Sequence, residues 1–269
     1  MPDIRYAQNE NVDRGDLRMQ VIERGTSTPI DDAKISISYS GDPDSTVEEV
    51  NTDASGMSET LTLDTPPLEL SMQPSEVQPY AEYTIQVTAK GYRPINISGI
   101  EVFSGQLSLQ EIRMDAEEAA ESMTDNIVIP AHTLFAEYPP KIAEAEIKPV
   151  TETGEIVLSR VVIPEYVIVH DGAPSDPTAR DYYVRYRDYI KNVASSEIYS
   201  TWPDTTIRAN VLAIMSFTLN RVYTEWYRNK GYSFTITSST AYDQKFMYGR
   251  NIYQSISDVV DEMFQNYLS

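Results

Sequence analysis

The chain has 269 residues, enough for two domains that each bury a core, and 41% of them are hydrophobic, as in ordinary globular proteins. It has no cysteine, which excludes disulfides and thiolate chemistry, and no run of about 18 apolar residues that could span a membrane. The formal net charge is −20, with 24 acidic against 8 basic residues in 1–130 and 17 against 13 in 131–269. Such a surface repels nucleic acid, so we expect no nucleic-acid partner. It favours solubility and leaves open a protein partner for the acidic first half.

Residues 1–14 are expected to form a polar tail or an edge segment, and they lack the apolar stretch of a secretion signal. Between residues 15 and 114, five segments alternate apolar and polar residues, as half-buried β-strands do. They are 17–23, 33–39, 58–63, 83–90 and 107–114. Turn residues such as Thr28-Pro29 and Pro66-Pro67 separate them, so the region is predicted to be a small β-sandwich.

Three short motifs in this region match a known kind of module. They are Pro29-Ile30 followed by Ala33-Lys34-Ile35, Thr52-Asp53 followed by Gly56, and Tyr83-Thr84-Ile85 followed by Val87 and Gly91-Tyr92. The region resembles the carboxypeptidase-regulatory-like, or transthyretin-like, modules. The resemblance implies a spacer, scaffold or docking surface rather than an active site.

The acidic stretch Asp42–Thr46 has some of the residues of a calcium-binding loop. An EF-hand loop that began at Asp42 would need a glycine and a glutamate where Val47 and Asp53 stand. We therefore expect a solvated acidic loop here and no metal.

Residues 115–126 are acidic and small, and we place a linker and the domain boundary there. Residues 127–150 contain four prolines and are expected to run in extended form along the second domain. Two extended pieces within 156–169 and a loop at 170–177 should follow. The pattern then predicts a helix from Ala179 or Arg180 to Tyr199 and a long helix that ends near Lys230, where Gly231 provides a C-terminal stop. A strand at 232–237 and a helix at 251–268 complete the prediction.

The first of these helices has a carboxylate on an apolar face. Ile190, Val193, Ala194 and Glu197 recur at helical spacing. Burying an unpaired charge is costly, so a carboxyl group in this position tends to stay protonated. Residues 200–204 then break the helix, and the next helix has a seam of apolar residues, Leu212, Met215, Leu219, Val222 and Trp226.

The same stretch has the motifs of a known family. The matching segments are Val193–Ile198 with Trp202-Pro203, Ile207–Asn210 with Ala213–Phe217, and Ser239–Gln244 with Gly249. Residues 160–269 resemble the SpoIID/LytB family, the sporulation and lytic-enhancer proteins that act on peptidoglycan. The chain departs from the family at Met215, where an arginine is usual, and at Asn210, where a glutamine is usual. The family domain also continues past the position of Ser269, which implies an incomplete domain here.

The resemblance implies a lytic transglycosylase that cleaves peptidoglycan glycan strands. Glu197 would act first as acid and then as base, and the 6-hydroxyl of the sugar would close an anhydro ring. Gln244, Ser239 and Thr240 would form hydrogen bonds to the glycan. Trp202 and Tyr199 would stack on its sugar rings.

Each of these residues also has a structural interpretation. Glu197 could end a helix or pair with Lys191, Arg208 or Lys245. Gln244 could stabilise a turn, and the two aromatic side chains could pack into the core. The sequence therefore leaves two functions open, the glycan-cleaving enzyme and a non-catalytic structural or adaptor protein of a phage-like or cell-wall-associated assembly.

Other chemistries lack a motif. The two histidines, His132 and His170, have no partner at zinc-ligand spacing, and no nucleotide-binding glycine motif or nucleophile elbow occurs. We expect no metal and no cofactor. The predicted fold class is α+β, with a transthyretin-like β-sandwich at 15–114 and a helix-rich, SpoIID-like α+β domain at 127–269. Without a signal, we expect synthesis in the cytoplasm and action at the cell wall or in a wall-directed particle.

Overall fold

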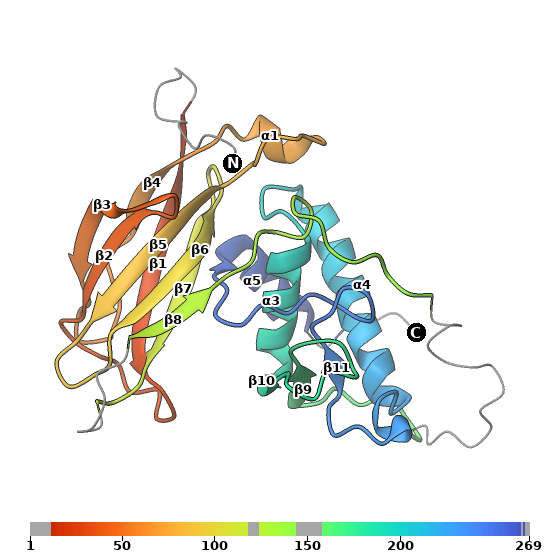
Figure 1. Cartoon of the computed structure of the whole chain (residues 1–269). Helices are drawn as coiled ribbons and strands as arrows, with labels where there is room; N and C mark the ends of the chain where they lie inside the picture. Colours follow the sequence, from red (N-terminus) through yellow and green to blue (C-terminus); the bar gives the residue numbers. More distant parts are fainter. Residues whose placement is uncertain (1–11, 118–123, 144–157, 265, 267–269) are drawn as a thin grey trace. The chain divides into compact units, whose positions relative to one another are not determined.

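The structure is a computed structural model, and it describes residues 12–117, 124–143, 158–264 and 266. The chain is a mixed α+β protein in which strands predominate (Figure 1). It divides into two compact units. The first consists of Met1–Ala131, Ser200–Trp202 and Tyr248–Ser255, and the second of His132–Tyr199, Pro203–Met247 and Ile256–Ser269. The two units are described in turn.

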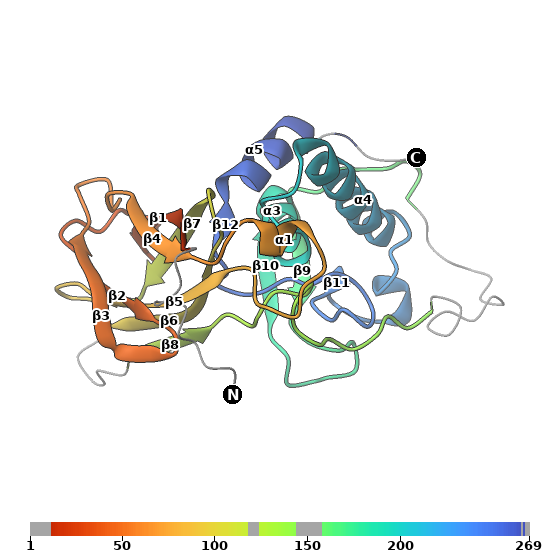
Figure 2. The same cartoon turned by 90° about the horizontal axis from the view of Figure 1, so that it is seen from above.

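The first unit is a sandwich of two sheets, which Figure 2 shows as separate layers. One sheet has the order β12-β7-β1-β4, in which β12 is Ile252–Tyr253. Strand β1 (Asp13–Glu23) is antiparallel to β4 (Leu61–Thr65) and parallel to β7 (Leu107–Met114). The other sheet has the order β3-β2-β5-β6-β8. Its strands are β2 (Lys34–Tyr39), β3 (Asp42–Asn51), β5 (Ala81–Thr88), β6 (Ile95–Val102) and β8 (Asp125–Val128). A short helix, α1 (Glu69–Met72), follows β4.

The core of this unit comes from the alternating residues of the strands. On β1, Leu17, Met19 and Val21 are fully buried, while Arg18 and Gln20 between them are half-buried. Each such apolar side chain contributes about 1.5–3 kcal/mol when it leaves water. The five strands predicted from alternation are present, and the predicted β-sandwich is confirmed.

Four strands of the first unit, β3, β6, β8 and β12, were not predicted from the sequence pattern. The expected loop at Asp42–Thr46 is wrong, because these residues begin the exposed edge strand β3, which pairs with β2. Strand β6 is interrupted at Gly99, which has φ +81°. A Cβ atom at Gly99 would lie 2.3 Å from the carbonyl oxygen of Ile129, so only glycine allows this close approach.

A segment from near the end of the chain completes the first unit. Strand β12 (Ile252–Tyr253) pairs with β7, and the side chain of Asn251 donates to the carbonyl oxygen of Glu101 at 2.8 Å. The Arg250 guanidinium forms an ion pair with the Glu101 carboxylate, and both side chains are fully buried. The sequence predicted a single domain boundary at 115–126. The structure divides the chain differently, since residues 125–131 and 248–255 both belong to the first unit.

The second unit joins a small sheet to a pair of helices. The sheet has the order β10-β9-β11, with β9 (Tyr166–His170), β10 (Asp181–Arg185) and β11 (Ile236–Thr237). Helices α3 (Tyr186–Glu197) and α4 (Asp204–Tyr223) lie side by side (Figures 1 and 2). A 3-10 turn, η1 (Arg228–Lys230), and helix α5 (Gln254–Met263) follow, and the division between the units falls within α5.

Helix α3 begins later than the sequence pattern predicted. Residues 181–185 form β10 instead, because they pair with β9 in the register Tyr183↔Ile168. Tertiary pairing here overrides a local helical pattern. The predicted strand at 232–237 is reduced to β11. The helix predicted at 251–268 is present as α5 over Gln254–Met263 only, since residues 252–253 form β12 instead. The extended piece predicted from residue 156 is described only from residue 158, and residues 118–123 of the predicted linker lie outside the described residues.

Helix α4 ends earlier than predicted, and the reason lies in its C-terminal hydrogen bonds. Glu225 adopts the left-handed conformation with φ +47°. Its N–H donates to the carbonyl oxygen of Val222 at 3.2 Å, and the Trp226 N–H donates to that of Arg221 at 3.1 Å. This pair of bonds is a Schellman motif, which usually has glycine at the position of Glu225. The expected stop at Gly231, with φ +85°, ends the short 3-10 turn instead.

Candidate functional site

Helix α3 brings Glu197 to the edge of the core of the second unit. Ile190, Val193 and Ala194 on the same helix face are completely buried, as the helical spacing predicted. Glu197 is the last residue of the helix and is half-buried. Its carboxyl group is therefore only partly hydrated.

The surroundings of Glu197 favour its protonated form. Burial raises the pKa of the carboxyl group to about 7, although an N–H donor from Lys245 and the positive charge of Lys141 both act to lower it. The Lys245 N–H donates to Oε1 of Glu197 at 2.7 Å. Among the described residues, no ion pair includes Glu197.

The cationic side chains that could have paired with Glu197 contact other groups. Lys191 pairs with Asp261 at 2.8 Å, and Arg208 pairs with Asp204 and Glu262. Lys245 contacts Glu197 through its backbone only. Its ammonium group lies 5.5 Å from the ring centroid of Tyr138, and burial lowers its pKa.

The segment that contacts Glu197 is held in place by a buried network. Asp243 accepts a hydrogen bond from Nε of Arg221 at 2.8 Å, and both side chains are almost fully buried. The same carboxylate accepts from the Tyr227 hydroxyl and from the N–H and hydroxyl of Thr237. Because residues 243–245 are contiguous, this network fixes the N–H group that binds Glu197.

Gln244 lies beside this contact but faces the protein interior. Its side chain is 5% exposed. Its Oε1 atom lies 3.2 Å from the Tyr189 hydroxyl and 2.8 Å from the Thr218 hydroxyl, and its Nε2 donates to the Ile214 carbonyl oxygen at 3.1 Å. In this arrangement Gln244 links α3 to α4.

The other residues expected to bind a glycan also contact protein groups. The Thr240 hydroxyl donates to the Pro139 carbonyl oxygen at 3.2 Å, and the Ser239 carbonyl accepts the N–H of Asp243 at 2.8 Å. Tyr199 is 8% exposed and packs against the His132 ring, with centroids 4.7 Å apart.

Trp202 belongs to the first unit. Its indole N–H donates to the Ser71 carbonyl oxygen at 3.0 Å. The second unit therefore brings Glu197 and the segment of Gln244 together, while Trp202 is held among residues of the first unit.

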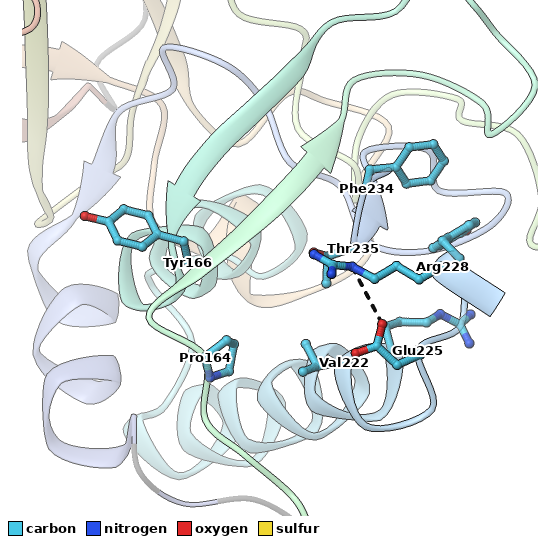
Figure 3. A pocket seen from close by; sticks show the side chains of 9 residues that line it. Pro164, Tyr166, Val222, Glu225, Arg228, Phe234 and Thr235 are labelled. Carbon is cyan, nitrogen blue, oxygen red and sulfur yellow. Dashed lines mark ion pairs between the residues drawn. The ribbon is translucent and has the colours of Figure 1, made fainter. Parts of the chain in front are cut away.

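The second unit also contains a small pocket of about 150 Å³ that does not include Glu197. Its lining residues come from the C-terminal end of α4, the turn after it and the start of β9 (Figure 3). They are Pro164, Tyr166, Arg221, Val222, Glu225, Tyr227, Arg228, Phe234 and Thr235. No sequence motif predicted this pocket.

The structural contributions of Asp243 and Lys245 were also missed. Asp243 lies within the SpoIID-like segment Ser239–Gln244, but its partners Arg221 and Tyr227 are distant in sequence. The only signal in the sequence was the position of Asp243 next to Gln244.

No protein family model and no curated protein matches the chain. Among solved structures, the Bacillus anthracis TIE protein is 15% identical over 42% of this chain and 20% of that chain, with a TM-score of 0.27. The 5-hydroxyisourate hydrolase of Klebsiella pneumoniae is 18% identical over 38% of this chain and 92% of that chain, with a TM-score of 0.26. Wild-type catechol 1,2-dioxygenase of Acinetobacter radioresistens is 13% identical over 43% of this chain and 58% of that chain, with a TM-score of 0.26. Similarities at this level carry no functional argument.

The part of the chain that the structure describes contains no group of three or more histidine, aspartate or glutamate side chains arranged to hold a metal ion. None of its helices is long and apolar enough to cross a membrane.

Proposed function

We propose that the second unit is a SpoIID-like domain that acts on peptidoglycan glycan strands, with Glu197 as the general acid and then the general base. The observation that carries the proposal is the position of the Glu197 carboxyl group, which is half-buried at the end of α3 and has no cation partner among the described residues, so that burial raises its pKa to about 7. A carboxyl group with a pKa of about 7 can donate a proton to a glycosidic oxygen and then remove one from the 6-hydroxyl of the sugar.

The hydrogen bond from Lys245 supports this role. It holds Oε1, so that Oε2 is the atom that can exchange a proton with a substrate. Lys141 supplies a positive charge that stabilises the carboxylate once the proton has left. The first unit, a carboxypeptidase-regulatory-like sandwich in this proposal, would serve as a spacer or docking module.

A digest of purified glycan strands tests the proposal. We expect products with anhydro-sugar ends from the wild type, and a loss of about 10²- to 10⁴-fold in rate with Glu197→Gln. Glu165→Gln is the matched control, since Glu165 is exposed and, among the described residues, only its backbone carbonyl forms a hydrogen bond. The rate should fall as the pH rises through about 7, because the proton donor is then lost.

The proposal of an enzyme would be contradicted if the wild type formed no anhydro products, or if Glu197→Gln formed them at the same rate as the wild type. A second candidate, a non-catalytic structural or adaptor protein, would then be favoured. The observation in its favour is that Gln244, Tyr199 and Trp202 already contact protein groups. This candidate predicts binding to glycan strands or to a partner protein without any product.

A further inference from the structure

The pocket at the end of α4 presents two opposite charges beside each other. Nε of Arg228 lies 3.6 Å from Oε2 of Glu225, and the two side chains are 57% and 24% exposed. In Figure 3 the Arg228 side chain extends over that of Glu225, and the dashed line marks the ion pair between them. An exposed ion pair of this length contributes little to stability, so a ligand can separate it at low cost.

The other lining groups complete a site with polar and apolar sides. The Thr235 hydroxyl oxygen accepts the Ile168 N–H at 3.2 Å, and its own proton has no acceptor among the described residues. Pro164, Val222 and Phe234 supply apolar walls. Arg221 and Tyr227 also line the pocket, but they are engaged with Asp243.

The backbone of Glu225 gives a second, independent indication of a function. Glu225 occupies the left-handed position of the Schellman motif, where glycine has no steric cost and a residue with a Cβ atom is strained. A strained residue whose side chain lines a pocket is a candidate functional residue. Glycine in this position would stabilise the turn but would remove the carboxylate from the pocket.

From these observations we infer that the pocket binds the zwitterionic head group of an α-amino acid. The ligand carboxylate would accept hydrogen bonds from Arg228 and Thr235, and its ammonium group would donate to Glu225. A cavity of about 150 Å³ holds a molecule of the size of benzene, which limits the bound part to a small amino acid or the head of a larger one. This site is separate from Glu197 and does not depend on its role.

The test uses the full chain and a set of probes that differ in charge. L- and D-alanine are the zwitterions, N-acetylalanine lacks the ammonium charge, and alaninamide lacks the carboxylate. We expect alanine, at up to about 50 mM, to shift the amide NMR signals of Glu225, Trp226 and Thr235. Each single-charge probe should bind at least about tenfold more weakly, because it loses one charge-assisted hydrogen bond.

Substitutions then separate binding from folding. Arg228→Gln and Glu225→Gln should each weaken alanine binding about tenfold or more, whereas Arg180→Gln, an exposed arginine that does not line the pocket, should not. Glu225→Gly should raise the thermal midpoint by about 2–4 °C and still abolish binding, because it relieves the strain and removes the acceptor.

A longer probe distinguishes the source of the ligand. Norleucine has the same head group as alanine and a longer side chain. If it binds as well as alanine, the ligand is the head of a larger molecule. If it binds more weakly, the ligand is a free small amino acid. The inference is overturned if alanine causes no shifts at these residues, if N-acetylalanine binds as well as alanine, or if Glu225→Gly binds as the wild type does.

Discussion

The two units bury charge in different ways. In the first unit, Glu101 and Arg250 form a fully buried ion pair that joins the returning segment to the sandwich. In the second unit, Arg221 and Asp243 do the same for the segment after β11. Beside that second pair, however, Glu197 is half-buried, and its one donor among the described residues is a backbone N–H, so burial raises its pKa to about 7. A buried carboxylate with its own cation supports the fold, while one without a cation is available for proton transfer.

The largest expected effect comes from removing one partner of each buried pair. Arg250→Met and Arg221→Met should each lower the free energy of unfolding by about 3–5 kcal/mol, because each leaves an uncompensated buried carboxylate. The two tryptophans report the units separately, since Trp202 belongs to the first and Trp226 to the second. In a Trp226→Phe background, Arg250→Met should move the Trp202 transition in urea. In a Trp202→Phe background, Arg221→Met should move the Trp226 transition.

Arg14→Met is the control for this experiment. Arg14 forms an ion pair with Asp64 at 3.4 Å, in which the two side chains are 65% and 46% exposed, and no measurable change is expected. If Arg14→Met lowered the free energy of unfolding as much as Arg250→Met, the buried ion pairs would have no special structural role.

A smaller effect, with a dependence on pH, is expected for Glu197→Gln. The pKa of Glu197 is higher in the folded chain, at about 7, than the ordinary value of 4.5, so its ionisation destabilises the fold. This loss of unfolding free energy is absent below about pH 4.5, grows between about pH 4.5 and pH 7, and is constant above pH 7. Glu197→Gln should therefore stabilise the protein by about 3 kcal/mol at pH 8 and leave it unchanged at pH 4. Urea unfolding at the two pH values measures the difference, and a gain that does not depend on pH would contradict the raised pKa.

The smallest effect should come from Gln244→Leu, which removes the polar link between α3 and α4. We expect a loss of about 1–2 kcal/mol in unfolding free energy, because the Ile214 carbonyl oxygen and the Tyr189 hydroxyl lose a partner. Tyr189→Phe should give part of the same loss. A Gln244→Leu variant with unchanged stability but lost glycan binding would favour the substrate contact expected from the sequence.

Local patterns predicted those elements whose residues alternate or recur at a fixed spacing. The alternation of β1 and the apolar face of α3 were predicted because they reflect one strand or helix against one core. Strand β3 was missed because its acidic, exposed residues have the composition of a turn, and only its pairing with β2 makes it a strand. The end of α4 was missed because the left-handed residue is a glutamate rather than a glycine.

The candidate site could be predicted only in part. The position of Glu197 on an apolar face of α3 follows from helical spacing, and the structure places it there. Three other features depend on contacts between residues distant in sequence. They are the inward orientation of Gln244, the assignment of Trp202 to the first unit, and the pocket at Glu225 and Arg228. No local pattern contains that information.

The protonation of Glu197 is the claim on which the proposed chemistry depends, and it can be measured directly. The chain would be labelled with ¹³C at the glutamate side-chain carboxyl carbons, and the signal of Glu197 identified by its loss in Glu197→Gln. The account predicts that this signal titrates with a pKa of about 7. A pKa between about 4 and 5, the ordinary range of an exposed glutamate, would contradict it.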